Sequence, residues 1–241
     1  MLILKSFAEA LCQLLVLTVF FVAIKPWQKA NNVQKITLFF CIFHLIDVAL
    51  IQNFKVSFSD NQEWNWGGKI ASLSWTLIFV FTNPILTRED IGWTLKIAHK
   101  RSIFLGIGTL LFVQIILQIL ILGGSGQFCD KETFFYQATM PGFAEELVFR
   151  GIFLGLLNKI FLFRWTFLNV TFGWGLILSA VLFGLVHGLH YDKNWAFHFD
   201  FLSFIQTGFV GIIFGILKEK SKSLLPSIIY HNLSNLAIMC R

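Results

Sequence analysis

The stretch Met140-Pro-Gly-Phe-Ala-Glu-Glu-Leu-Val-Phe-Arg-Gly-Ile-Phe-Leu-Gly155 places two adjacent carboxylates and an arginine inside an otherwise apolar run. Charges inside a membrane cost about 2.5–3.5 kcal/mol each on insertion scales, so they are usually paired and usually functional. Glu146 and Arg150 are four residues apart and share one face of an α-helix, so they can form an ion pair. Glu145 is rotated by about 100° from that face. We therefore expect Glu146 to be neutralised on its own helix and Glu145 to be available for chemistry.

The composition of the whole chain is that of a membrane protein. Of its 241 residues, 56% are hydrophobic and only 13% are charged, whereas soluble domains average about 25% charged residues. Apolar runs recur along the whole length, so we predict a single membrane domain over residues 1–241. The net charge of +6 does not indicate nucleic acid, because lysine and arginine in a membrane protein first report topology. Membrane lipids are the expected surroundings.

A spanning helix needs roughly 20 mostly apolar residues. Eight segments of the chain are mostly apolar and close to that length. They are residues 6–24, 34–52, 70–86, 102–122, 132–157, 172–188, 200–217 and 223–240. We therefore predict an all-α polytopic membrane protein with about eight transmembrane helices around an intramembrane cavity. The aromatic-rich segment 160–172 is expected to lie at the membrane interface or to re-enter the membrane.

The basic residues are distributed unevenly between the two sides of such a bundle. With eight spans, one side receives twelve of them: Lys25, Lys29, Lys35, Arg88, Lys96, Lys100, Arg101, Lys159, Arg164, Lys218, Lys220 and Lys222. The other side receives six: Lys5, Lys55, Lys69, Lys131, Lys193 and Arg241. The positive-inside rule assigns the richer side to the cytoplasm and both termini to the opposite side. Short loops and compact length favour a bacterial cytoplasmic membrane.

Most of the other polar groups within the apolar segments fall in the second half of the chain. Phe183-Gly-Leu-Val-His187 ends the sixth segment, and His231-Asn-Leu-Ser-Asn235 lies in the eighth. His231 and Asn235 share a helix face, whereas Asn232 is rotated off it and is given no role. A lone intramembrane histidine often makes only a helix-to-helix hydrogen bond. These groups therefore indicate a function only by occurring together.

Three weaker sequence features also give expectations. His44 and Asp47 are three residues apart in the second segment, which favours a structural inter-helix hydrogen bond over a proton relay. The four cysteines show no CxxC spacing, so we expect neither a disulfide framework nor a thiolate metal site.

At about 1.5 Å per residue, Glu145 falls nearer the cytoplasmic half of the membrane and His187 nearer the outside. Bringing them together would need a displaced, tilted or broken helix.

A carboxylate, two histidines and an amide around one cavity suit the hydrolysis of a peptide bond. Glu145 can take a proton from water as a general base, and His187 can orient that water or protonate the leaving amine. His231 and Asn235 can donate hydrogen bonds to the oxyanion, where one donor is typically worth about 3 kcal/mol. The Glu146–Arg150 pair would brace the helix.

The same residues also allow a metal site. Glu145, His187 and His231 could be three ligands of a zinc ion, with water in the open position. Both arrangements need oxygen and imidazole groups around one water, so the residues alone do not separate them.

In order along the chain, Glu145-Glu146-Leu-Val-Phe-Arg150, Phe183-Gly-Leu-Val-His187 and His231-Asn-Leu-Ser-Asn235 resemble the CPBP family. This family comprises CAAX proteases and bacteriocin-processing enzymes and is also called the Abi family. Its pattern is EExxxR, then FxxxH, then HxxxN/D. The resemblance covers residues 134–237, which we take as the catalytic core.

The resemblance implies a helical membrane fold with a water-accessible cavity and endoproteolysis of the type II CAAX prenyl endopeptidase kind. It implies Glu145 as the base, His187 as its partner on the water, and His231 with Asn235 as the oxyanion site. Members are often labelled metalloproteases, but the glutamate mechanism requires no metal, and we favour it. The expected substrate is a membrane-associated peptide or a prenylated CAAX-type protein. The alternatives are a non-enzymatic immunity or scaffold protein and a small transporter.

Overall fold

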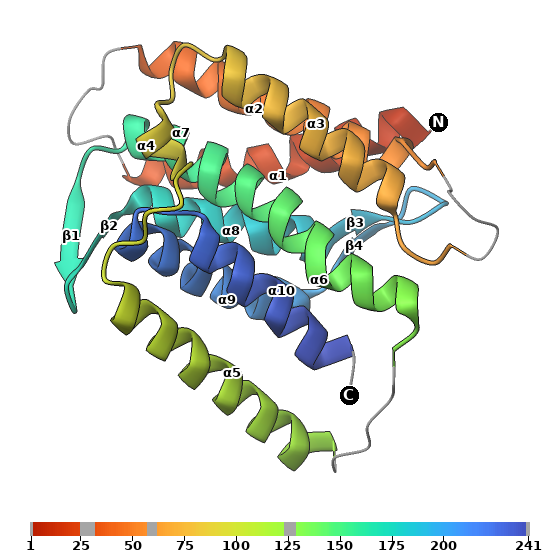
Figure 1. Ribbon diagram of the computed structural model, residues 1–241. Coiled ribbons are helices and arrows are strands. Elements are labelled where there is room, and N and C mark those ends of the chain that lie inside the picture. Colours follow the sequence, from red (N-terminus) through yellow and green to blue (C-terminus); the bar gives the residue numbers. More distant parts are fainter. Residues whose placement is uncertain (1, 25–31, 57–61, 123–128, 240–241) are drawn as a thin grey trace.

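The computed structural model describes residues 2–24, 32–56, 62–122 and 129–239. All eight apolar segments predicted from the sequence are helical (Figure 1). In chain order they are α1 (Leu2–Ile24), α2 (Val33–Asn53), α3 (Trp66–Thr82), α5 (Lys100–Leu122), the continuous run of α6 (Lys131–Glu146), η1 (Leu147–Phe153) and α7 (Leu154–Ile160), then α8 (Trp174–Gly188), α9 (Phe201–Ser221) and α10 (Leu225–Met239).

Four helices within the described part of the chain are long and apolar enough to cross a membrane by length and composition, namely α1, α2, α5 and α9. The expectation of about eight transmembrane helices is not confirmed by this criterion and stays a prediction. The shorter helix α8 is also apolar. The helices run back and forth along one common direction, so their connections gather at two ends of the bundle (Figure 1).

The two ends of the bundle differ in their irregular elements. One end holds the short helix α4 (Arg88–Ile91) and the hairpin of β1 (Arg164–Phe167) and β2 (Val170–Gly173). We call it the basic end, because the positive-inside count assigns its loops to the richer side. The start of α1, the end of α10 and the hairpin of β3 (Leu189–Tyr191) and β4 (Phe197–Phe199) lie towards the other end (Figure 1).

The prediction of an all-α fold is wrong for these two short antiparallel sheets. In the first sheet Arg164 pairs with Gly173 and Phe167 with Val170. The turn residues Leu168 and Asn169 both have positive φ, at 49° and 60°, which is the backbone of a tight two-residue hairpin turn. Phe167 and Leu168 are exposed, as expected for a segment at a membrane interface.

The lengths of the helices explain why Glu145 and His187 lie close together, although the sequence places them at different depths in the membrane. The run from α6 to α7 has 30 residues, which at about 1.5 Å each is longer than the roughly 30 Å hydrocarbon core. Helix α8 has only 15 residues, or about 22 Å, and β3 follows directly. Because α6 is long and α8 ends early, Glu145 and His187 meet without a break in α8.

Polar side chains join neighbouring helices in the first half of the bundle. His44 Nε2 lies 2.8 Å from Gln13 Oε1 of α1, and Ser72 of α3 donates a hydrogen bond to Asp47 at 2.5 Å. The predicted inter-helix hydrogen bonds of these α2 residues are therefore confirmed.

The expectation for the cysteines was wrong at one position, because Cys129 is disulfide-bonded.

Close packing of α6 against α10 depends on Gly142. Its backbone N–H donates to Asn232 Oδ1 at 2.8 Å, so Asn232, which the sequence left without a role, ties the two helices together. A Cβ atom at position 142 would lie 2.8 Å from the Ile228 carbonyl oxygen and against the Asn232 side chain. The backbones can approach this closely only because glycine has no side chain.

We predict that Gly142→Ala destabilises the protein by about 1–3 kcal/mol, the usual cost of overpacking. Gly108→Ala on α5 is the matched control, because a Cβ atom there would meet nothing within 4 Å. Thermal unfolding in detergent measures both. An equal effect of the two variants would contradict the close α6–α10 contact.

Candidate active site

Three helices bring the predicted site residues together beside one cavity. Glu145 lies near the end of α6, His187 near the end of α8 and His231 in α10. Glu145 Oε2 is 4.0 Å from His187 Nε2 and 3.9 Å from His231 Nε2. All three line a cavity of about 460 Å³, which Asn235 lines as well. Trp64 and Met239 also line it, so it lies in the half of the bundle away from the basic end.

The other oxygen of Glu145 is held by a residue that the sequence reasoning missed. Lys69 Nζ of α3 lies 2.5 Å from Glu145 Oε1. Glu145 therefore has a charge partner on another helix, which the sequence did not predict. Because Lys69 occupies only Oε1, Oε2 is left facing the two imidazoles. No sequence pattern pointed to Lys69, since it lies 76 residues before its partner.

The tautomer of neutral His187 follows from its hydrogen bond within α8. His187 Nδ1 lies 2.7 Å from the Phe183 carbonyl oxygen, and a carbonyl only accepts, so Nδ1–H is the donor. In neutral imidazole Nε2 is then an acceptor, and it faces Glu145. The spacing from Phe183 to His187 is one helical turn, which gives the FxxxH pattern a physical reason.

His231 is oriented by a buried carboxylate. Its Nδ1 lies 2.8 Å from Glu146 Oε1, so Nδ1–H donates to the carboxylate. Its ring stacks on Phe214 with centroids 4.6 Å apart. With Nδ1–H bound to Glu146, Nε2 is the ring nitrogen that faces Glu145 Oε2, at 3.9 Å.

The predicted ion pair between Glu146 and Arg150 forms in the core of the bundle. Arg150 Nη1 lies 3.2 Å from Glu146 Oε1, and both side chains are at most 1% exposed. The guanidinium also donates to the Gly211 carbonyl at 3.1 Å and lies 4.3 Å from the Phe183 ring centroid and 5.0 Å from that of Phe214. Arg150 thus joins the segment that follows Glu145 to α8 and α9.

A π-helix begins directly after the two glutamates. The segment η1 continues α6 from Leu147 to Phe153. Such wider turns are rare and are found mostly at functional sites. Every residue of η1 is buried, and Ser179 of α8 donates to the Phe149 carbonyl at 2.8 Å. The wider turn therefore changes the helix face at the point where α6 meets the other site helices.

Asn235 lines the cavity and is held by a second residue that the sequence reasoning missed. Its Nδ2 donates to Gln137 Oε1 at 3.0 Å, and Gln137 is buried. A side-chain amide has two N–H groups, so one remains for the cavity. Gln137 lies two helical turns before Glu145, and that spacing on one face is the only sequence signal that could have identified it.

A second, smaller cavity lies on the other side of Glu145. It has a volume of about 140 Å³ and is lined by His44, Asp47, Lys69, Glu145 and His187, among others. Within the described residues, the buried His44 Nδ1 has no hydrogen-bond partner. At about 30 Å³ per molecule, the space could hold roughly four waters. The carboxylate of Glu145 therefore stands between an apolar and a polar cavity.

The alternative of a zinc ion can be tested against the donor set. Within the ranges that the structure describes, no group of three or more His, Cys, Asp or Glu side chains is arranged to hold a metal ion. A cation bound at Glu145 would also be repelled by Lys69, whose ammonium is 2.5 Å from Oε1. The residues fit a water between carboxylate and imidazole better than a metal bound by Glu145, His187 and His231.

The helical bundle and the glutamate between two histidines are features expected of an intramembrane protease. In comparison with protein families, residues 132–237 match the family model described as Type II CAAX prenyl endopeptidase Rce1-like. This match confirms the resemblance to the type II CAAX prenyl endopeptidases seen in the sequence. No curated protein and no solved structure matches the chain significantly. Together with the four long apolar helices, this match points to an integral membrane protein.

We predict that Arg150→Met destabilises the protein by about 3–5 kcal/mol, because it leaves the Glu146 carboxylate buried without its cation. The double variant Glu146→Gln/Arg150→Met removes both charges and should recover part of that loss. Thermal unfolding in detergent measures the series. A double variant that is less stable than Arg150→Met would contradict the assignment of the pair as a buried, compensated charge.

Proposed function

We propose that the chain is an intramembrane endopeptidase in which Glu145 activates water to hydrolyse a peptide bond. The observation that carries this proposal is that the two carboxylate oxygens of Glu145 make different contacts. Oε1 is fixed by Lys69 at 2.5 Å, and Oε2 lies about 4 Å from two imidazole nitrogens. These gaps are too long for direct hydrogen bonds and suit a bridging water.

A water in this gap would be oriented by two acceptors. Glu145 Oε2 accepts one of its hydrogens and neutral His187 Nε2 accepts the other, so an oxygen lone pair points into the substrate cavity. On attack at the carbonyl carbon, the proton of the water passes to Glu145. That proton is then delivered to the amide nitrogen as the C–N bond breaks. The small polar cavity behind Glu145 offers a store of water for this step.

The charge of the tetrahedral intermediate needs hydrogen-bond donors. With both ring nitrogens protonated, His231 would donate through Nε2–H, and Asn235 would donate through the N–H that Gln137 does not use. Such preorganised donors usually make the largest single contribution to catalysis. Arg150 and Glu146 act indirectly, because they fix the orientation of the His231 ring.

The cavity favours a membrane-associated peptide substrate. Apolar side chains, including Phe183, Val210 and Ile238, line it beside the polar groups, and it lies in the half of the bundle away from the basic end. If the basic end faces the cytoplasm, as the positive-inside count predicts, the cavity lies nearer the opposite side. This orientation favours a membrane-embedded or exported peptide over the prenylated C-terminus of a cytosolic protein.

We predict that Glu145→Gln lowers cleavage of a quenched fluorescent lipopeptide library by at least about 1,000-fold, within the range of general-base catalysis. Glu63→Gln makes the same chemical change at an exposed site and should leave the rate unchanged. Retained cleavage in the Glu145 variant would contradict the proposal. A folded wild-type protein that cleaves no peptide would favour the non-enzymatic alternative.

We predict that Lys69→Met lowers kcat by roughly 10- to 100-fold, because a misplaced catalytic group costs about that much. KM should change little, since Lys69 does not line the substrate cavity among the described residues. Lys69→Arg should keep part of the activity, because it restores the cation. Steady-state kinetics on the same peptide measure the two constants. A raised KM with unchanged kcat would instead place Lys69 in substrate binding.

A further inference from the structure

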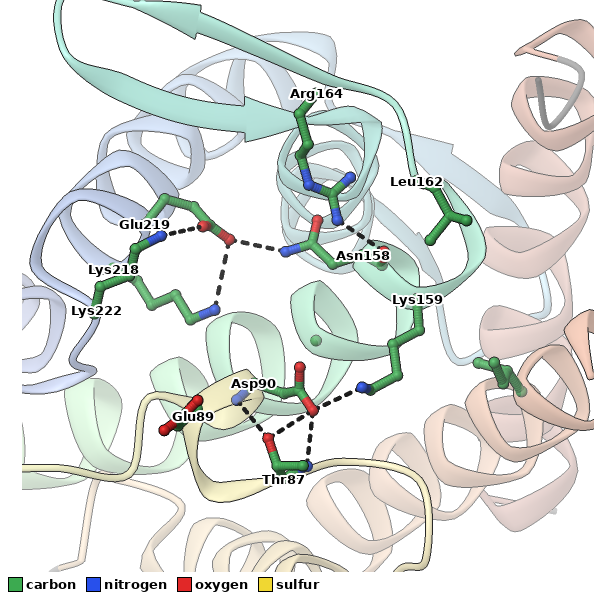
Figure 2. A pocket seen from close by; sticks show the side chains of 12 residues that line it. Thr87, Glu89, Asp90, Asn158, Lys159, Leu162, Arg164, Lys218, Glu219 and Lys222 are labelled. Carbon is green, nitrogen blue, oxygen red and sulfur yellow. Dashed lines mark hydrogen bonds and ion pairs between the residues drawn. The ribbon is translucent and has the colours of Figure 1, made fainter. Parts of the chain in front are cut away.

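The largest of the cavities described lies at the basic end of the bundle, away from Glu145. It has a volume of about 620 Å³ and is bordered by α4, α7, β1 and the end of α9. Charged and polar side chains from all four elements point into it (Figure 2). We call it the basic-end pocket.

The charges that line this pocket do not balance. Four are cations, namely Lys159, Arg164, Lys218 and Lys222, and three are carboxylates, namely Glu89, Asp90 and Glu219. One positive charge is therefore left over. In a pocket bordered by protein, such a surplus favours an anionic ligand more strongly than it would in open water.

One ion pair in the pocket is neutral and fixed. Lys159 Nζ lies 2.8 Å from Asp90 Oδ2, which also accepts hydrogen bonds from the backbone and hydroxyl of Thr87 at 2.8 Å. Burial alone would raise the pKa of Asp90, but the hydrogen bonds from Lys159 and Thr87 together lower that pKa below its usual value. This pair forms one wall of the pocket and contributes no free charge.

Two lysines on the opposite wall share a single carboxylate. Lys218 Nζ lies 3.5 Å and Lys222 Nζ 3.6 Å from the oxygens of Glu219, which also accepts a hydrogen bond from Asn158 at 2.8 Å (Figure 2). Lys222 is the accessible cation of this group, because 66% of its side chain is exposed. It can leave Glu219 to Lys218 and turn to a ligand.

Arg164 supplies a cation with no carboxylate partner. Its guanidinium donates to three backbone carbonyls, those of Asn158 at 2.7 Å, Phe161 at 2.5 Å and Phe163 at 3.1 Å. In the described part of the chain no carboxylate lies within ion-pair distance of it. The guanidinium is thus held in place without an ion pair, and the Glu219 carboxylate acts on it only from beyond ion-pair distance. A fixed planar guanidinium suits the paired oxygens of a phosphate.

Apolar side chains place the pocket at the level of a membrane surface. Leu162 borders the pocket and is 42% exposed, and the adjoining hairpin exposes Phe163, Phe167 and Leu168. Exposed aromatic and apolar residues next to basic ones are typical of the membrane–water interface. A ligand that carries a phosphate in the pocket and acyl chains along the hairpin would contact both.

We propose that the basic-end pocket binds the phosphodiester headgroup of an anionic phospholipid, with Arg164 and Lys222 as its phosphate ligands. One phosphodiester charge balances the surplus positive charge of the lining. The bound headgroup would connect β1 to the end of α9, and α9 also carries Val210 and Phe214 of the active-site cavity. The proposal does not depend on proteolysis, so it can fail or hold separately from the proposed function.

The test measures lipid retention by native mass spectrometry of the full chain in mixed phosphatidylglycerol and phosphatidylcholine nanodiscs. The wild type should retain one phosphatidylglycerol, and Arg164→Gln/Lys222→Gln should weaken its retention about tenfold or more, given the cost of two surface cations. The matched control Lys100→Gln/Arg101→Gln removes one lysine and one arginine from the same end, outside the pocket lining. It should behave like the wild type.

A single variant and a competition with soluble phosphates complete the test. Lys222→Gln alone should weaken retention without unfolding the protein, because this side chain is largely exposed. Addition of glycerol phosphate or inorganic phosphate should not displace the lipid. Equal retention in wild-type and pocket variants, equal loss in the control variant, or displacement by a soluble phosphate would overturn the assignment to an anionic lipid.

Discussion

The contact of Glu146 with Arg150 and His231 is the constraint on which the rest of this structure depends. Two fully buried charges and an imidazole meet where α6, α8, α9 and α10 converge, and each is costly to bury alone. Arg150 spans to the Gly211 carbonyl and to the rings of Phe183 and Phe214. Once these groups are paired, the position of His231 is set, and Glu145, one residue along the helix, must face the cavity.

The site also depends on helices that lie outside the segment matching the protease family. That segment starts at residue 132, yet the oxygen of Glu145 that does not face the imidazoles is held by Lys69 of α3. The small polar cavity behind it is lined by α1 and α2 residues such as Gln13 and His44. The N-terminal helices therefore complete the environment of the carboxylate rather than only enclosing the core.

The sequence predicted the helices and singled out residues that the structure brings together beside one cavity. It missed contacts between segments far apart in the chain and elements only a few residues long. The eight apolar runs and the Glu146–Arg150 pair follow from helical period and burial alone. Lys69 could not be predicted, because its contact with Glu145 exists only after α3 packs on α6. The β1–β2 hairpin was missed because four-residue strands beside a Leu168-Asn169 turn leave too short a pattern. The π-turn after Glu146 has no propensity signal.

The central claim is that Glu145 activates water without a metal ion. The most direct measurement is the cleavage rate of purified wild-type protein at a series of zinc contents, fixed by chelator treatment and checked by elemental analysis. The account predicts a rate per molecule that is independent of zinc content, with the activity lost only when Glu145 is replaced. A rate that rises in proportion to bound zinc, and that is restored by adding zinc after chelation, would contradict it.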